Sequence, residues 1–370
     1  MNMASKRDSK DKEVQKTLEG LGHDLVKQIE KGENPSIEMP VRSLNNIYFD
    51  QKTKTIKLGD KTSQRQFLNV AHARKFMQTT LIAKEIRNII GEKATISIRD
   101  LYYALKHTIP GTQENTFEDQ AESDPVIEDL EASLNLLREE FHLAASSKGV
   151  IAGDMVIQDG DDVIDLTKMG SGGWGMPSNV EPDRIEIKKM KAKYILFIEK
   201  DAVWKRFNED KFWDKNKCLI ITGRGQPSRA ERRLVQRLNK EYEIPVYALM
   251  DADPWGMYIY SVIKQGSISL SYSEEKLATP DTKYLGLTVS DVEKYDIPKE
   301  VTIKLNKLDV KRLNEMKGYE WFKKKEWQKE FDLMKEKEVK LELEALSKKG
   351  IRFITEKYLP QKMKEEDFLP

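Results

Sequence analysis

Apolar residues close to the N-terminus recur at helical spacing. They form one amphipathic stretch, which stops before Gly32 and Pro35 and consists of Val14, Leu18, Leu21, Leu25, Val26 and Ile29. Positions three or four residues apart share one face of a helix, so this stretch predicts a helix that docks on another surface. From Val41 to Leu58 the pattern becomes strand-like on both sides of a polar turn, which predicts a β-hairpin.

Three further helices are expected before residue 150. Apolar residues recur at helical spacing over 65–90. Ser97, followed three residues later by Asp100, is the pattern of a capping box, and it opens a short helix over 98–107. The third helix is predicted over 125–141.

A second β-hairpin is expected after these helices. Residues 150–157 and 163–166 are strand-like, and Asp159 and Gly160 between them favour a tight turn. Three helices followed by a hairpin are typical of a winged-helix domain, which is a variant of the helix-turn-helix. We therefore predict a winged-helix domain over residues 65–169.

The C-terminal part has a different pattern of hydrophobic residues. After a glycine-rich stretch, which predicts a linker at 170–182, apolar strands alternate with helices. The expected strands are 194–198, 218–222 and 246–250, and the expected helices are 202–207 and 228–240. Such alternation favours a mostly parallel, Rossmann-like sheet. The predicted fold class is multidomain, α/β and α+β, with an N-terminal segment (1–64), the winged-helix domain and a second domain (183–370) that ends in charged helices.

Composition narrows the picture further. A chain of 370 residues is long enough for two domains with separate cores, or for three small ones. No apolar run reaches the roughly 18 residues that cross a bilayer, so we expect a soluble protein without a membrane partner. Its lysine-rich N-terminus lacks the apolar core of a secretory signal, and Cys218 is the only cysteine, so we expect a cytoplasmic protein without disulfides. The net charge of +1 does not indicate that the protein binds nucleic acid. Evidence for such binding would have to come from local clusters of basic residues.

Three acidic residues follow predicted strands of the second domain. Glu199 comes after the first strand, and Asp251 and Asp253 come after the third. The carboxyl ends of parallel strands lie along one edge of a sheet, where open α/β folds keep their sites. Carboxylate oxygens of this kind suit Mg²⁺ and phosphoryl transfer. The alternative is that these acids only cap helices or lie in solvated loops.

Two adjacent tyrosines fall on different faces of the predicted helix at 98–107. Tyr102 shares an apolar stripe with Leu101 and Leu105, whereas Tyr103 shares a face with Arg99. Tyr102 is therefore predicted to be buried and Tyr103 exposed. A phenol with an ordinary pKa of about 10 is a poor nucleophile at neutral pH, and a nearby cation such as Arg99 would help it. An exposed tyrosine without a chemical role is the alternative.

Basic residues form a stripe on the predicted helix at 228–240. The stripe consists of Arg229, Arg232, Arg233, Arg237 and Lys240. Such cations bind DNA phosphates when they face a duplex, and a solvated helix face is the alternative. We predict that Arg224, Arg229, Arg233 and Arg237 contact DNA.

Several short motifs resemble one family. Those of the second domain resemble the Toprim fold of topoisomerases and primases, and they are Glu199-Lys200-Asp201-Ala202-Val203, Gly223-Arg224-Gly225-Gln226-Pro227 and Asp251-Ala252-Asp253-Pro254-Trp255-Gly256. In the first domain, Ile98-Arg99-Asp100-Leu101-Tyr102-Tyr103 resembles the Arg-acid-x-Tyr-Tyr motif of topoisomerase VI A subunits and of meiotic double-strand-break proteins. The resemblance covers roughly residues 65 to 300.

This resemblance implies a function as the DNA-cleaving subunit of an archaeal, ATP-dependent type II topoisomerase, an isomerase. Tyr103 would be the nucleophile, with Arg99 beside it, and Glu199, Asp251 and Asp253 would hold Mg²⁺. The family implies a 5′-phosphotyrosyl link, strand passage and religation, which relax supercoils and decatenate DNA at the nucleoid.

The resemblance also implies an assembly. One tyrosine cuts one strand, so two A subunits would act as a dimer, with the tyrosine of one protomer beside the metal of the other. An ATPase B subunit would complete an A2B2 heterotetramer, because this sequence contains no G-x-x-x-x-G-K-[ST] phosphate loop. The N-terminal amphipathic helix is the candidate contact with B. Three alternatives stay open: a recombination-initiating break-maker, a hydrolytic Toprim nuclease, and a non-enzymatic DNA-binding protein.

Overall fold

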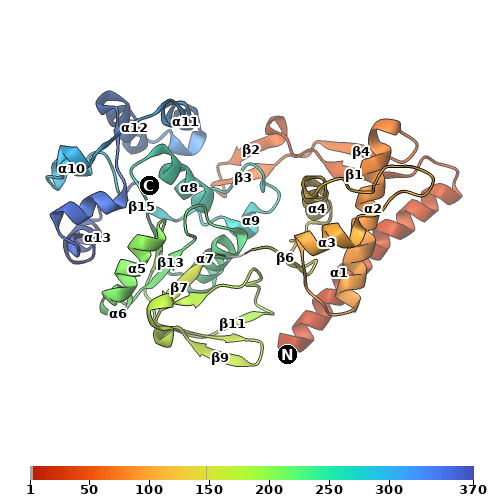
Figure 1. The fold of residues 1–370 in the computed structure, drawn as a ribbon, viewed down its shortest axis with the longest axis horizontal. Coiled ribbons are helices and arrows are strands. Elements are labelled where there is room, and N and C mark those ends of the chain that lie inside the picture. Colours follow the sequence, from red (N-terminus) through yellow and green to blue (C-terminus); the bar gives the residue numbers. More distant parts are fainter. Residues whose placement is uncertain (1–2, 147) are drawn as a thin grey trace.

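Two separate hydrophobic cores organise the chain. The computed structural model describes residues 3–146 and 148–370. One core is built from residues between Val14 and Leu143, and the other from residues between Val150 and Leu359. In Figure 1 the first lies in the red-to-orange lobe at the right, and the second in the green and blue lobe at the left. A smaller third cluster consists of Ile37, Met39 and Phe76, and Leu21 packs against both it and the first core.

The N-terminal lobe combines helices with short two-stranded sheets. In chain order the elements of this part of the chain are α1 (Met3–Glu30), β1 (Ser36–Pro40), β2 (Ile47–Asp50), β3 (Thr55–Leu58), β4 (Thr62–Gln66), α2 (Val70–Gly91), β5 (Ile96–Ser97), α3 (Ile98–Leu105), α4 (Gln120–Leu134) and β6 (Leu143–Ala144), of which β2 and β3 contact the other lobe. Val14 and Leu18 of α1 are buried in the core that Ile82 and Ile86 of α2 also form. The amphipathic helix is therefore confirmed, although Val26 and Ile29 near its end stay exposed.

The three expected helices after residue 65 exist, with shifted ends. Asn69 caps α2, so this helix begins at Val70 instead of residue 65. The capping box of Ser97 and Asp100 opens α3 as predicted. Helix α4 begins earlier than expected and ends at Leu134, because Asn135 adopts the left-handed conformation (φ 53°) that terminates helices.

The predicted N-terminal segment, residues 1–64, is divided between the two lobes. β1 pairs with β4, which packs on α2 in the N-terminal lobe. The expected hairpin forms as β2 and β3, but it packs on the other lobe, where Phe49 lies 5.6 Å from Trp321 between ring centroids and the N–H of Ile56 donates to the carbonyl of Gln265 at 2.9 Å. This segment is therefore not one unit.

A six-stranded sheet forms the centre of the second lobe. Its order is β10-β7-β13-β12-β14-β15, in which β13, β12, β14 and β15 run parallel. The strands are β7 (Val150–Gly153), β10 (Trp174–Gly175), β12 (Ile195–Ile198), β13 (Leu219–Thr222), β14 (Val246–Leu249) and β15 (Lys283–Gly286). The mostly parallel sheet and its three central strands are confirmed, whereas β15 was missed.

Helices cover this sheet and fill the C-terminal part. They are α5 (Asp201–Glu209), α6 (Phe212–Asn216), α7 (Arg229–Tyr242), α8 (Pro254–Lys264), α9 (Glu274–Leu277), α10 (Asp291–Lys294), α11 (Lys307–Lys317), α12 (Lys325–Lys337) and α13 (Leu359–Lys364), with a small sheet of β16 (Ile303–Lys304) and β17 (Val339–Lys340). The predicted helices at 202–207 and 228–240 correspond to α5 and α7. Within the residues described, no helix combines the length and the apolar character needed to span a bilayer.

The predicted wing of the first domain is wrong. The stretch 150–157 is broken at Gly153 (φ 141°), where an added Cβ would lie 2.6 Å from the carbonyl oxygen of Cys218. The break sends β7 into the six-stranded sheet, antiparallel to β13. The hairpin of β8 (Met155–Asp159) and β9 (Asp162–Asp165) pairs with β11 (Ile185–Met190) instead of lying on α2–α4. The second core therefore begins at Val150, not after residue 169.

The predicted linker at 170–182 is also corrected. Trp174 and Gly175 form β10, the edge strand beside β7, and Trp174 is buried. Gly173 has φ 66°, and an added Cβ would lie 2.6 Å from the ring of Trp204. This glycine-rich stretch is thus packed against the sheet and α5, as part of the second lobe.

Candidate functional site

Glu199 and Asp251 meet at the carboxyl edge of the parallel sheet. β12 and β14 are adjacent, with Ile198 opposite Leu249, so the acids that follow them are neighbours. The backbone N–H of Asp251 donates to Glu199 Oε2 at 2.9 Å. Asp253 caps α8, where its Oδ1 accepts the N–H of Gly256 at 2.6 Å. Glu199 and Asp251 are thus in contact, whereas the side chain of Asp253 acts as a helix cap, which is the alternative reading for this residue.

Burial and mutual repulsion disfavour the charged forms of these acids. Glu199 is only 8% exposed and Asp251 only 4%. Burial raises the pKa of Glu199 to about 8, and the charges of Asp251 and Asp253 add to the shift. Burial likewise raises the pKa of Asp251 to about 6, although Lys200 and the N–H of Leu343 oppose the shift. Both acids therefore favour their neutral forms unless a cation compensates their charge, and Lys200 does so only in part at Asp251.

The close approach of these acids depends on Gly256 in the first turn of α8. A Cβ at this position would lie 2.7 Å from the carbonyl oxygen of Asp251 and 2.9 Å from Glu199 Oε2. Any larger residue would push α8 away from both acids.

A C-terminal segment, residues 339–344, completes the site. Leu341 forms a β-bridge with Ala252, and the N–H of Leu343 donates to Asp251 Oδ1 at 2.8 Å. Lys200 Nζ lies 3.0 Å from Asp251 Oδ2, 3.0 Å from Glu342 and 2.8 Å from Glu344. Sequence reasoning missed Glu342 and Glu344 and assigned no role to Lys200. Acids alternate with leucines from Leu341 to Glu344, but this pattern predicts a strand, whereas the structure has a 3-10 helix from Leu343 onward, so the sequence held no reliable signal for these two glutamates.

The donor set suits magnesium chemically. Carboxylate oxygens are the hard ligands that Mg²⁺ takes, usually in small number and together with water. As they stand, both Asp251 oxygens and one Asp253 oxygen already accept hydrogen bonds. Among residues 3–146 and 148–370, no three His, Cys, Asp or Glu side chains are arranged to hold a metal ion. Asp251 therefore has no oxygen without a hydrogen-bond partner.

The two tyrosines of α3 differ as predicted. Tyr102 is buried, and its hydroxyl donates to the carbonyl of Glu118 at 3.0 Å and accepts from Lys106 Nζ at 2.8 Å. Tyr103 is 60% exposed, and the guanidinium carbon of Arg99 lies 6.0 Å from the centroid of its ring. Only Tyr103 is thus accessible to a macromolecular substrate.

Within one chain, Tyr103 and the carboxylates lie on different lobes. In Figure 1, α3 belongs to the orange lobe, whereas α5, which begins just after Glu199, and α8, which begins just after Asp253, belong to the green lobe. The fold does not bring the tyrosine to the acids of the same chain.

Arg224 lies beside the acids, on the loop after β13. The N–H of Gly225 donates to the carbonyl of Glu199 at 2.9 Å, which ties this loop to the site. Arg224 has a left-handed backbone (φ 53°) and an exposed side chain, whose Nε donates to Asp201 at 3.1 Å. It is the predicted DNA-binding arginine that stays accessible.

The arginine stripe of α7 faces protein, which corrects the predicted DNA contacts of Arg229, Arg233 and Arg237. Arg229 pairs with Glu131 at 2.6 Å and Glu139 at 3.3 Å, and Arg233 pairs with Glu181 at 2.5 Å. Arg237 pairs with Glu241 at 2.8 Å and is buried.

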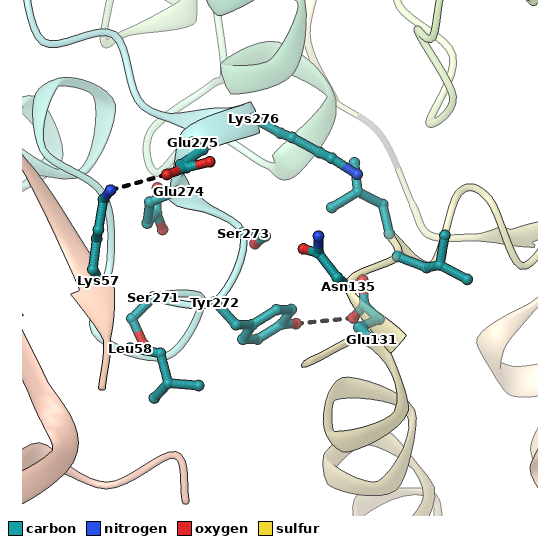
Figure 2. A pocket seen from close by; sticks show the side chains of 12 residues that line it. Lys57, Leu58, Glu131, Asn135, Ser271, Tyr272, Ser273, Glu274, Glu275 and Lys276 are labelled. Carbon is teal, nitrogen blue, oxygen red and sulfur yellow. Dashed lines mark hydrogen bonds and ion pairs between the residues drawn. The ribbon is translucent and has the colours of Figure 1, made fainter. Parts of the chain in front are cut away.

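Glu131, the main partner of Arg229, also accepts from the hydroxyl of Tyr272 at 2.9 Å (Figure 2). Glu131 and Tyr272 line a cavity between the end of α4, β3 and the segment before α9, as Figure 2 shows. Its volume is about 300 Å³. Because α4 belongs to the N-terminal lobe and α7 to the other, the Arg229 cluster joins the two lobes.

The sequence matches three families in succession. Residues 74–143 match the type IIB DNA topoisomerase family, residues 148–191 match the all-beta domain in DNA topoisomerase VI alpha subunit, and residues 194–363 match the Toprim domain of topoisomerase 6 A subunits and Spo11. The separate all-beta match agrees with the position of β7–β11 outside the N-terminal lobe.

Relatives match along almost the whole chain. The A subunit of type 2 DNA topoisomerase 6 from Pyrococcus abyssi is 47% identical over 367 residues, which cover 96% of this chain and 95% of that protein. The corresponding protein of Sulfurisphaera tokodaii is 41% identical, with 99% and 100% covered. The A subunit of DNA topoisomerase 6 from Arabidopsis thaliana is 35% identical, with 96% and 81% covered. The chain therefore belongs to the family of type IIB DNA topoisomerase A subunits.

Proposed function

We propose that this DNA-cleaving subunit cuts one strand per chain by transesterification at Tyr103. The Oη of Tyr103 attacks a backbone phosphorus, the bond from phosphorus to the 3′ oxygen breaks, and the 3′-hydroxyl leaves with a proton. The 5′ end remains attached as a phosphotyrosine, and the reverse reaction religates the strand. The exposure of Tyr103 on a capped helix whose neighbouring tyrosine is buried carries this proposal.

Arg99 is proposed to assist the attack. It lies one turn before Tyr103 and is exposed on the same side of α3. A guanidinium stays charged at any ordinary pH and binds phosphate oxygens with paired donors. It would hold the scissile phosphate beside the hydroxyl of Tyr103.

Glu199, Asp251 and Asp253 are proposed to hold Mg²⁺. Toprim domains of topoisomerases generally bind this ion, and the assignment is supported by the buried acids at the sheet edge, whose charged forms a cation would favour. When bound, the ion neutralises charge on the phosphate and helps to position it. Arg224, on the adjacent loop, is proposed to bind a neighbouring DNA phosphate.

Two chains are proposed to act together as a dimer. Tyr103 and the acids are on different lobes of one chain, so the simplest complete site combines the tyrosine of one protomer with the acids of the other. Strand passage then requires the ATPase B subunit, in an A2B2 heterotetramer. The exposed Val26 and Ile29 of α1 are the proposed contact with B, and a chain lacking α1 that still co-purifies with B would exclude this contact.

The helices α2, α3 and α4 are proposed to form the winged-helix module that presents Tyr103 to DNA, without the hairpin first assigned as its wing. A chain that acts on chromosomal DNA belongs at the nucleoid, which is where we propose that it works.

The direct test is detection of protein attached to labelled 5′ DNA ends on a denaturing gel, with the B subunit, ATP and Mg²⁺ present. Wild type should form the adduct, and Tyr103→Phe should lose it completely. The matched control is Tyr102→Phe, which removes a buried hydroxyl from the same helix and should retain the adduct. Free ends that persist in Tyr103→Phe would instead identify a hydrolytic nuclease.

A further inference from the structure

Lys200 makes three ion pairs around the acidic site. A lysine ammonium has three N–H donors. Here its three partners are Asp251 at 3.0 Å, Glu342 at 3.0 Å and Glu344 at 2.8 Å. All donors of the lysine are thus directed at carboxylates, of which one belongs to the proposed metal site and two come from the C-terminal segment.

These contacts determine which partner Asp251 can release. Its Oδ1 accepts the N–H of Leu343, which the β-bridge of Leu341 with Ala252 holds in place. Its Oδ2 is bound by Lys200, whose side chain is 23% exposed. Only the lysine can move away from Asp251 without a change in the backbone. Oδ2 is therefore the oxygen of Asp251 that becomes free to bind a metal ion.

We propose that Lys200 is a resident cation that neutralises Asp251 until a divalent metal binds, and that Glu342 and Glu344 then retain the displaced ammonium. The inference rests on the magnesium site proposed above. Lys200 is in this sense a positioning residue, which acts on the metal through Asp251.

The replacement of Lys200 by a metal ion at Asp251 requires only a small movement, and it leaves no buried charge without a partner. The ammonium already lies within 3.0 Å of both glutamates, so release of Asp251 needs only a small rotation of the lysine side chain. The side chains of Glu342 and Glu344 are 51% and 44% exposed, so water can follow the lysine. A buried carboxylate stripped of its partner is strongly unfavourable, and the exchange keeps Asp251 paired with a cation in both states.

The inference predicts opposite effects of two sets of substitutions on Mg²⁺ affinity, measured by calorimetry on the full-length chain. Lys200→Met should bind Mg²⁺ about tenfold or more tightly than wild type, because a neighbouring positive charge no longer opposes the ion. Glu342→Gln with Glu344→Gln should bind Mg²⁺ more weakly, because the lysine then has no other carboxylate to join. In the Lys200→Met background the two glutamine changes should have no effect.

Controls separate this inference from the site on which it rests. Lys200→Arg keeps the charge and should stay near wild-type affinity, and Lys200→Gln is a second neutral variant if Lys200→Met does not fold. If Glu199→Gln abolishes Mg²⁺ binding but Lys200→Met and Lys200→Gln bind as wild type does, the lysine exchange is refuted and the site stands. If the glutamine changes weaken binding even without Lys200, the glutamates bind the metal directly and the exchange is again refuted. If Glu199→Gln leaves Mg²⁺ binding intact, the proposed site and the inference both fail.

Discussion

Lys264, at the end of α8, is a residue whose surroundings oppose its charge. Burial lowers the pKa of Lys264 from 10.5 to about 8, and Lys324 and other lysines contribute. Its Nζ still donates to the carbonyl of Thr282. Because the folded state binds this proton less tightly than the unfolded chain does, the charge penalises folding below pH 8, and the penalty disappears as the pH rises from about 8 to 10.5.

Replacement of this lysine should therefore stabilise the protein in a pH-dependent way. Lys264→Met should raise the free energy of unfolding at pH 7 by about 1–3 kcal/mol, and the gain should shrink towards pH 10. Urea denaturation at both pH values measures the difference. An equal gain at both would mean that apolar burial, not charge, is responsible.

At the scale of the element, the end of α4 depends on one left-handed residue. Asn135 ends the helix with φ 53° and its N–H donates to the carbonyl of Glu131. Glycine adopts this conformation freely, and asparagine tolerates it better than residues with a larger Cβ penalty do. The same turn holds Glu131 opposite Arg229.

A pair of substitutions at Asn135 tests this helix end. Asn135→Ala should lower the free energy of unfolding by about 1 kcal/mol, whereas Asn135→Gly should leave it nearly unchanged. Denaturant titration of both variants is sufficient. If alanine is tolerated as well as glycine, the helix continues past residue 134 and Asn135 is not its determinant.

At the scale of the whole molecule, Arg229 and Glu131 join the two lobes through a buried ion pair. Their side chains are 6% and 0% exposed. Removal of one partner leaves the other charged and buried, so Arg229→Met should lower the free energy of unfolding by about 3–5 kcal/mol. Arg229→Met with Glu131→Gln should cost less than the sum of the single changes in a double-mutant cycle. Additive losses would show that the pair does not couple the lobes.

The dimer gives a second prediction at this scale. Tyr103→Phe chains and Glu199→Gln chains should each be inactive alone. If the tyrosine and the acids of one site come from different protomers, a heterodimer of the two variants should contain one complete site. With the B subunit, co-expressed and separately tagged chains should then attach to one DNA strand and nick the duplex. Absence of any nick from purified heterodimers would place the tyrosine and the acids of one chain in the same site.

Local geometry made part of this structure predictable from sequence. The i to i+4 periodicity of α3 is enough to separate buried Tyr102 from exposed Tyr103, because a helix turns by a constant angle per residue. Glu199 and Asp251 could be expected at one edge because strands of a parallel sheet end on the same side. The capping box at Ser97 is likewise a signal within four residues.

Contacts between residues far apart in the sequence determined the features that the sequence did not predict. The arginines of α7 look like a DNA-binding stripe in sequence, yet Glu131, the partner of Arg229, is 98 residues away. Gly153, with its positive φ, ends β7 before β8, and the two strands join different sheets; the segment that carries Glu342 and Glu344 reaches Asp251 across 92 residues. Sequence by itself determined the elements and the faces of their side chains, because both follow from local backbone geometry. Only the tertiary structure decided which charges are paired, because that depends on where distant segments pack.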